Sequence, residues 1–345
     1  MLRVLTPLLI IVSLVVYSTY LSKTVDPVPG YPIWMQDSDG HYTNQTSGIC
    51  IVSDSANIKN FIVADDIGVI RRVVINENIF PHTIRIDSIH LSAAAQSFLQ
   101  NFRKKDFEEI IFRKSDNKLL ISIEGYVNDS NIVYDFKNYE GVFELQTNGN
   151  LISCDTITAI KKINVPSEVF EFTRVNVAIE GMTKSPNFYF MGLENAMISD
   201  IIFSDSTYIY ILDDDLKLLK KINTHDLGIM TICGLYAVND YELYCIDRNQ
   251  KKIFCIKFNP DFSVADYGVA DMNLTVPGYP EINKIMGFSP ESITFDNEGS
   301  IYVALDPWKE VYNPDVFDKK KLTAKDMEYF ANKVPVLYKF KNPFK

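Results

Sequence analysis

The sequence has few cysteines, and none of them falls in a metal-binding pattern. The five are Cys50, Cys154, Cys233, Cys245 and Cys255. This odd, widely spaced set does not make a disulfide framework. There is also no Cys-x-x-Cys pair and no pair of histidines at helical spacing, so the sequence predicts no zinc site. Cys245 and Cys255 flank a polar turn, which leaves two interpretations open: a cross-strand disulfide, or packing as small apolar residues between sheets, which we favour.

The sequence also lacks an excess of basic residues. It has 34 Lys and Arg against 44 Asp and Glu, a formal net charge of −10. Nucleic acids, and polyanions such as the substrate of a phytase, require clustered basic residues, so we expect neither as a partner. No Gly-x-Ser-x-Gly elbow and no Gly-x-x-x-x-Gly-Lys phosphate loop occurs. The composition, 47% hydrophobic and 23% charged, is that of an ordinary globular protein.

One long apolar run occurs, at the start of the chain. Arg3 precedes the run Val4 to Tyr17, and small residues precede a cleavage position after Ser18. Residues 1–22 therefore resemble a secretory signal peptide, or alternatively an uncleaved N-terminal anchor. We expect an exported protein, periplasmic, secreted or on the cell surface, that contacts a membrane only through this segment. Residues 23–46 are predicted to be an extended linker or first strand, and residues 47–345 a single, monomeric domain.

The rest of the chain repeats one short pattern. An apolar run begins at Ser, Gly or an acidic residue, turns through polar residues and returns through an aliphatic and aromatic run to a carboxylate. Such runs bounded by turn residues are typical of paired strands. The six units span Ser47–Asp66, Glu108–Glu124, Glu180–Glu194, Asp200–Asp213, Gly234–Asp247 and Glu291–Asp306.

A repeated antiparallel unit favours a β-propeller, because one unit cannot bury its own apolar face. Six units predict an all-β, six-bladed propeller. The third unit has no room for outer strands, so either one blade is truncated or the count is five. Ser92–Phe102 is predicted as a short helical insertion and Thr323–Lys333 as a short C-terminal helix. The strand predicted at Val334–Phe340 would close the ring by sharing a blade with N-terminal residues.

Five short motifs, in order, resemble the SdiA-regulated propeller family and the related phytase-like esterase propellers. They cover most of the chain after residue 46. Two positions depart from the family pattern, because Glu109 and Ser292 stand where small residues are usual. The motifs are Ser47-Gly48-Ile49, Asp106-x-Glu108-Glu109-Ile110, Ile179-Glu180-Gly181-Met182 with Glu194, Ser199-Asp200 and Pro290-Glu291-Ser292-Ile293.

This resemblance implies a secreted six-bladed propeller with a metal ion near the central channel. The pair Pro290-Glu291 also looks like the ligand motif of metal-dependent lactonase propellers. The repeats themselves point to the same place, because the innermost strand of every blade lines the axis. Carboxylates that converge there raise each other's pKa, and Ca²⁺ accepts six to eight oxygens at irregular geometry. The predicted metal ligands are Glu108, Glu180, Asp200 and Glu291.

The alternative for these four acids is a scaffold role, in which they accept hydrogen bonds from backbone amides of the next blade. A second set of acids ends strands, and there we expect turn-fixing roles. It comprises Asp65, Asp66, Glu124, Glu194, Asp213, Asp247 and Asp306.

Three functions follow from these observations. The first is a Ca²⁺-binding propeller that holds a ligand or a protein partner through its loops. The second is a metal-dependent hydrolase of an ester, lactone or phosphoester that uses the channel cation. The third is an interaction scaffold without metal.

Overall fold

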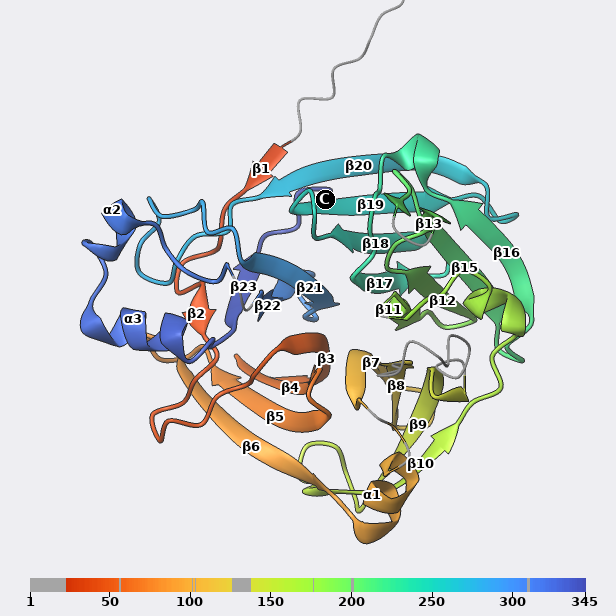
Figure 1. Cartoon of the computed structure of the whole chain (residues 1–345), viewed down its shortest axis with the longest axis horizontal. Helices are drawn as coiled ribbons and strands as arrows, with labels where there is room; N and C mark the ends of the chain where they lie inside the picture. The colour runs from red at the N-terminus through yellow and green to blue at the C-terminus, as the bar shows by residue number, and fades with distance from the viewer. Residues whose placement is uncertain are drawn as a thin grey trace, which may run out of the picture.

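The structure is a computed structural model that describes residues 23–55, 57–100, 102, 104–125, 138–175, 177–199, 202–308 and 311–345. Antiparallel sheets stand around a central axis in this part of the chain (Figure 1). The first blade contains β3 (Thr46–Ser55), β4 (Ile58–Asp65), β5 (Val69–Asn76) and β6 (Thr83–Leu91). The second contains β7 (Asp106–Arg113), β8 (Lys118–Glu124), β9 (Gly141–Thr147) and β10 (Thr156–Lys162).

Three more blades follow around the axis. The third contains β11 (Ile179–Lys184), β12 (Phe188–Leu193), β15 (Tyr208–Asp213) and β16 (Leu218–Asn223). The fourth contains β17 (Gly234–Asn239), β18 (Glu242–Asp247), β19 (Lys252–Phe258) and β20 (Val264–Met272). The fifth contains β21 (Phe288–Phe295), β22 (Ile301–Pro307), β23 (Val336–Phe340) and β2 (Ile33–Trp34).

The innermost strands form a closed ring of five. Strand β3 contacts β7 and β21, β11 contacts β7 and β17, and β17 contacts β21. The described residues therefore form a five-bladed β-propeller, and the predicted count of six is wrong. The third and fourth sequence units are two halves of one blade, because β12 pairs directly with β15 through Tyr189 and Leu212. The residues between them form the small hairpin of β13 (Met197–Ser199) and β14 (Ile202–Phe203) in place of outer strands.

The two ends of the described chain close the ring together. Strand β2 pairs with β23, with Ile33 opposite Leu337, so an N-terminal strand is the outermost strand of the last blade. Strand β1 (Lys23–Val25) adds a parallel fifth strand to the edge of the fourth blade. Sharing of a blade by the two ends was expected, and it leaves this blade without an open seam.

Both predicted helices are present. Helix α1 (Ala93–Leu99) lies between the first two blades, and the Ser92 side chain caps it by accepting a hydrogen bond from the backbone N–H of Ala95. Beside α1, β6 and β10 pair in parallel and join the two blades at their outer edges. Helix α3 (Ala324–Ala331) begins with a capping box between Thr323 and Asp326. Short helices also occur at η2 (Ser167–Phe170), η3 (His225–Leu227) and α2 (Val316–Lys319).

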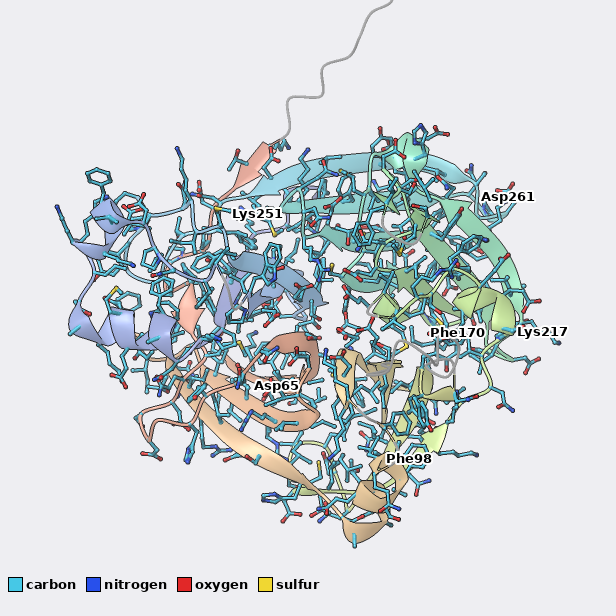
Figure 2. All side chains as sticks on the ribbon, viewed as in Figure 1. Asp65, Phe98, Phe170, Lys217, Lys251 and Asp261 are labelled. Atoms are coloured by element: carbon cyan, nitrogen blue, oxygen red, sulfur yellow. The ribbon has the colours of Figure 1, made fainter. Side chains whose placement is uncertain are left out.

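The apolar core lies between neighbouring blades, where side chains fill the space, for example around Phe98 of α1, whose ring meets that of Phe143 (Figure 2). Cys245 packs in the core between the third and fourth blades and Cys255 in the core between the fourth and fifth. The register of β18 and β19 explains why the two cysteines lie on opposite faces of the sheet: Cys255 lies opposite Tyr244, one residue away from Cys245, and Cys245 lies opposite Phe254. A shift of one residue turns a side chain to the other face of a sheet. All five cysteines are free and buried, as the packing interpretation predicts.

Candidate functional site

A cavity of about 650 Å³ opens at one end of the central channel. It lies where the inner strands begin and the second strands of the blades end. Eight carboxylate side chains line it, against the three cations Lys104, Arg248 and Lys251. The acids are Asp66, Asp106, Glu108, Glu124, Glu180, Glu194, Glu291 and Asp306.

A β-bulge at the start of four inner strands directs these acids into the channel. The pairing register shifts between Thr46 and Gly48 in β3, and correspondingly at the starts of β7, β11 and β21. A bulge leaves a residue without a ladder partner and re-aims its side chain, and bulges are over-represented at active sites. The bulged positions hold Ser47, Glu108, Glu180 and Glu291.

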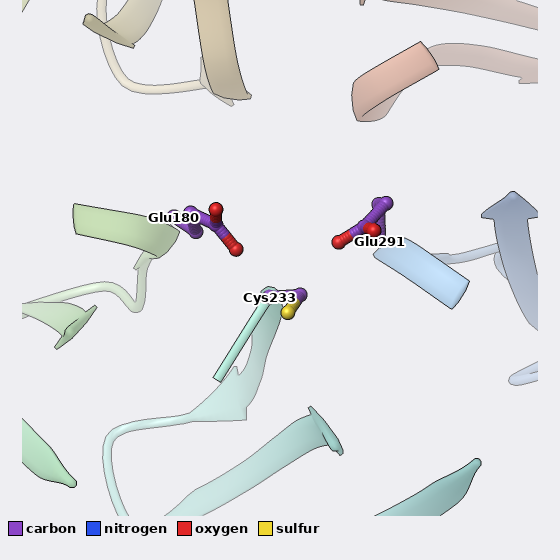
Figure 3. A group of neighbouring side chains, drawn as sticks. All are labelled: Glu180, Cys233 and Glu291. Carbon is purple, nitrogen blue, oxygen red and sulfur yellow. The ribbon is translucent and has the colours of Figure 1, made fainter. Parts of the chain in front are cut away.

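Arg248 occupies one side of the cavity. Its Nη1 donates to both carboxylate oxygens of Glu291 at 3.2 Å and lies 3.4 Å from Oε2 of Glu180. Its Nη2 donates to Glu194. Glu180 of β11 and Glu291 of β21 point toward one another from the third and fifth blades (Figure 3). Cys233, the residue before β17 of the fourth blade, lies beside them. The guanidinium therefore supplies the positive charge that a metal ion was predicted to supply between Glu180 and Glu291.

The pKa of the Glu180 carboxyl lies near neutral pH. Burial raises the pKa of its carboxyl and the charge of Glu291 raises it further, while Arg248 opposes both, so that the pKa is about 7. Burial also raises the pKa of the Cys233 thiol, and the charges of Glu291 and Glu180 add to this effect. Both effects favour the neutral thiol of Cys233 beside these two acids.

The other side of the cavity holds a trio of carboxylates. Asp106, Glu108 and Glu124 are buried, and each offers an oxygen within 4.8 Å of an oxygen of the others. Asp106 and Glu124 face each other in the register of β7 and β8. Lys104 forms an ion pair with Asp106. No described N–H group donates to Oε1 of Glu124.

Electrostatic repulsion in the trio is strong. Burial raises the pKa of Glu108 well above its usual range, and the charges of Asp106 and Glu180 raise it further. Burial and the charge of Asp106 likewise raise the pKa of Glu124. A divalent cation would relieve this repulsion, and carboxylate oxygens are the donors that Ca²⁺ takes. The trio fits such an ion.

The structure brings Glu108, Glu180 and Glu291 into one cavity, as the repeats predict, and Asp200 lies outside the described residues. The turn-fixing role expected for the second set of acids holds for Asp213 and Asp247, which accept backbone hydrogen bonds from Lys217 and Gln250. Asp65 also accepts a backbone hydrogen bond, from Asn44, and forms an ion pair with Arg71. The other four acids of this set line the cavity: Asp66, Glu124, Glu194 and Asp306. The first strand of an antiparallel hairpin begins where the second ends, so these acids stand beside the bulges.

The repeat pattern gave no sign of Arg248 or of the Asp106 contribution. A signal for Arg248 was nevertheless present in the sequence: it directly follows Asp247, the last carboxylate of a unit, and the ends of the units lie beside the channel. Asp106 appeared only within a motif.

The axis below the cavity is plugged by Glu109. Glycines 48, 181 and 234 occupy the inner strands at this level, where a Cβ on Gly48 would lie 2.5 Å from the backbone oxygen of Glu108. Oε1 of Glu109 accepts hydrogen bonds from the Ser292 hydroxyl at 2.6 Å and from the backbone N–H of Ile110 at 3.1 Å. Burial raises the pKa of this carboxyl well above its usual range. The two departures from the family pattern, Glu109 and Ser292, are thus partners in one contact.

No family model matches the chain, and no curated protein matches it in sequence. Several solved structures align with most of the chain at low identity. A luciferin-regenerating enzyme is 13% identical over 91% of this chain and 96% of its own, with a TM-score of 0.47. A PQQ-bound aldose sugar dehydrogenase from Streptomyces coelicolor is 7% identical over 91% and 99%, with a TM-score of 0.44. A glucose dehydrogenase is 8% identical over 90% and 99%, with a TM-score of 0.42. The strand topology by itself establishes the propeller fold.

In the described part of the chain, no helix has the length and apolar character needed to cross a membrane. Residues 1–22, the predicted signal peptide or anchor, lie outside the described residues.

Proposed function

We propose that this protein is a ligand-binding β-propeller that holds a Ca²⁺ ion in its central cavity. The ligands are Asp106, Glu108 and Glu124. One observation carries the proposal: three buried carboxylates lie within 4.8 Å of one another, and Lys104 is the cation that pairs with the trio in the described structure. Ions of like charge at this separation are unstable unless protons or a metal ion neutralise them.

The proposal revises the predicted ligand set. Glu291 belongs to Arg248, which contacts both of its oxygens, and the Ser289 hydroxyl donates to it at 2.6 Å. Glu108 stays in the set, and its neighbours Asp106 and Glu124 replace the acids of the other blades. The cation is thereby placed to one side of the channel, and the rest of the cavity is left for a ligand.

Calcium titration of the full chain tests the proposal. After treatment with EGTA and its removal, isothermal titration calorimetry should show one Ca²⁺ bound per chain. Thermal unfolding should show a melting temperature raised by Ca²⁺, and at a free concentration of 100 Kd the gain in unfolding free energy is about 2.7 kcal/mol. Glu124→Gln keeps the shape of the side chain but removes its charge, and it should weaken Ca²⁺ binding at least tenfold. Glu291→Gln should leave the Ca²⁺ affinity nearly unchanged. Asp261→Asn, on an exposed turn, is the control for loss of one charge.

The outcomes are distinct. Absence of Ca²⁺ binding to the native chain would refute the metal site. Equal losses in Glu124→Gln and Glu291→Gln would assign the ion to the whole ring of inner-strand acids instead of the trio.

The second candidate function is a metal-dependent hydrolase of an ester, lactone or phosphoester. It is favoured by Glu180, whose pKa of about 7 suits a general base at neutral pH, in a cavity of ligand size. A divalent cation bound at the trio would polarise the reacting carbonyl or phosphoryl oxygen. A panel of these three substrate classes, with and without Ca²⁺, tests it. Activity that requires Ca²⁺ and is lost in Glu180→Gln would establish the hydrolase, and inactivity on all three classes would leave a binding protein.

The resemblance to the SdiA-regulated family implies a metal ion near the central channel, where the trio lies, and the signal-like residues 1–22 support export. We infer an exported protein on that basis. Detection of the mature N-terminus after expression in the native host tests it.

A further inference from the structure

The cavity has more carboxyl groups than its own cations and one divalent ion could neutralise if all of these groups were ionised. Eight carboxylates face Lys104, Arg248 and Lys251, a formal surplus of five negative charges. A Ca²⁺ ion at the trio would leave three. Clefts lined by one sign of charge concentrate ligands of the opposite sign.

Glu180 is a carboxylate placed to receive a ligand, on the side of the cavity away from the trio. It is 9% exposed and lines the cavity. Arg248 gives its hydrogen bonds to Glu291 and Glu194, and only an ion-pair contact of 3.4 Å to Oε2 of Glu180. No described group donates a hydrogen bond to that oxygen. A buried acceptor without a donor is costly, and a ligand N–H group removes the cost.

Apolar side chains surround the acids at the cavity wall. They are Phe203, Met230, Met286, Phe288 and Trp308. Trp308 is 62% exposed and Met286 is 74% exposed, although both are large and apolar. Exposed apolar groups gathered at a cavity mark a contact surface, and the face of a Trp ring also attracts cations.

We propose that the cavity binds an organic amine, a molecule with a protonated amino group and an aromatic or apolar body. The ammonium group donates to Glu180, and the body lies against Phe203 and Trp308. A volume of about 650 Å³ accommodates such a ligand, since small-molecule sites span roughly 300–1,000 Å³. The inference rests on the proposed function for the use of this cavity as a binding site, but it does not require the Ca²⁺ ion.

Three probes that share an indole ring and differ in head-group charge test the inference. Tryptamine carries a positive charge at neutral pH, tryptophol none and indole-3-propionate a negative one. Titrated into the full chain, once in EGTA and once in saturating Ca²⁺, tryptamine should bind at least tenfold more tightly than tryptophol, about 1.4 kcal/mol. Indole-3-propionate should bind most weakly. Equal affinities for the three, or a preference for the acid, would overturn the proposal.

Variants locate the ammonium group. Glu180→Gln should reduce the preference for tryptamine over tryptophol to less than threefold. Trp308→Ala should weaken both probes alike and keep the preference. Glu194→Gln removes a carboxylate that already accepts a hydrogen bond from Arg248, and it should keep the preference as well. Equal loss of preference in Glu194→Gln and Glu180→Gln would overturn the assignment to Glu180, since general cavity charge would then explain the effect.

The calcium titration separates this inference from the metal site. Tight tryptamine binding by a chain that does not bind Ca²⁺ supports the amine site and refutes only the metal. Binding of Ca²⁺ without any preference for tryptamine refutes only the amine site. Displacement of Ca²⁺ by tryptamine, one for one, would place the ammonium at the trio and overturn the site at Glu180.

Discussion

Replacement of Arg248 by Met should destabilise the protein and make its stability strongly dependent on pH. The Arg248 side chain is 26% exposed, and it contacts carboxylates of three different residues, Glu180, Glu194 and Glu291. Methionine has similar length but no charge. The variant would therefore keep three carboxylates in a partly buried cavity without the cation that pairs with them.

The size of the effect follows from this geometry. Breaking a buried ion pair by removing one partner costs roughly 3–5 kcal/mol, and the partial exposure of Arg248 lowers our expectation to about 2–4 kcal/mol. An unfolding entropy of roughly 2.1 cal/mol/K per residue gives a chain of 345 residues about 1.4 °C per kcal/mol. The melting temperature should thus fall by roughly 3–6 °C at pH 8.

The pH dependence has a definite sign. The folded-state pKa of Glu180 is about 7, raised from 4.5, and Arg248 is the neighbour that holds it down. Between pH 4.5 and 7 the folded state binds more protons than the unfolded state, so the stability that this group contributes falls as the pH rises. Without Arg248 the pKa rises further and the window widens upward. The loss in Arg248→Met should therefore be larger at pH 8 than at pH 5.

Thermal unfolding of the native chain and of Arg248→Met, followed by circular dichroism at both pH values in EGTA, measures this. Arg248→Lys is the matched control, because it keeps the charge and should recover part of the stability. An unchanged melting temperature at pH 8, or a larger loss at pH 5, would refute the reasoning.

Two further predictions concern contacts away from the cavity. Lys339→Met should cost about 3–5 kcal/mol in denaturant unfolding, because Nζ of Lys339 lies 2.9 Å from both oxygens of Glu77 and 3.3 Å from Asp296, in the interior between the last and first blades. The double variant Lys339→Met/Glu77→Gln should lose less stability than Lys339→Met alone. A loss below about 1 kcal/mol in Lys339→Met would contradict the role of Lys339 as the buried partner of these two acids. Ser292→Ala should cost about 1–3 kcal/mol, because Glu109 loses the hydroxyl that donates to it at the axis, and unchanged unfolding would show that the plug does not depend on this bond.

The local pattern of the sequence was sufficient for the paired strands of the repeated units and for two helices, α1 and α3. Alternating apolar runs between turn residues produced β-hairpins, and the Ala-rich stretch after Ser92 and the Thr-x-x-Asp cap at Thr323 produced α1 and α3. These features depend on neighbours in the sequence. The number of blades does not, because it depends on which hairpins pair with each other. Pairing of β12 with β15 turned two repeats into one blade.

The site divides in the same way. Repetition alone placed Glu108, Glu180 and Glu291 at equivalent inner-strand positions, because equivalent strands of a propeller line the same axis. Sequence spacing did not reveal that Glu124 stands opposite Asp106, since that proximity comes from the register of β7 and β8.

By itself, then, the sequence determined a repeated antiparallel β structure with a ring of acids at its centre. Only the tertiary structure decided the partner of each acid. Arg248 neutralises one side of the cavity and the trio of Asp106, Glu108 and Glu124 occupies the other. The physical reason is that charge compensation depends on distances of a few ångströms between strands of different blades, and no local sequence pattern encodes those distances.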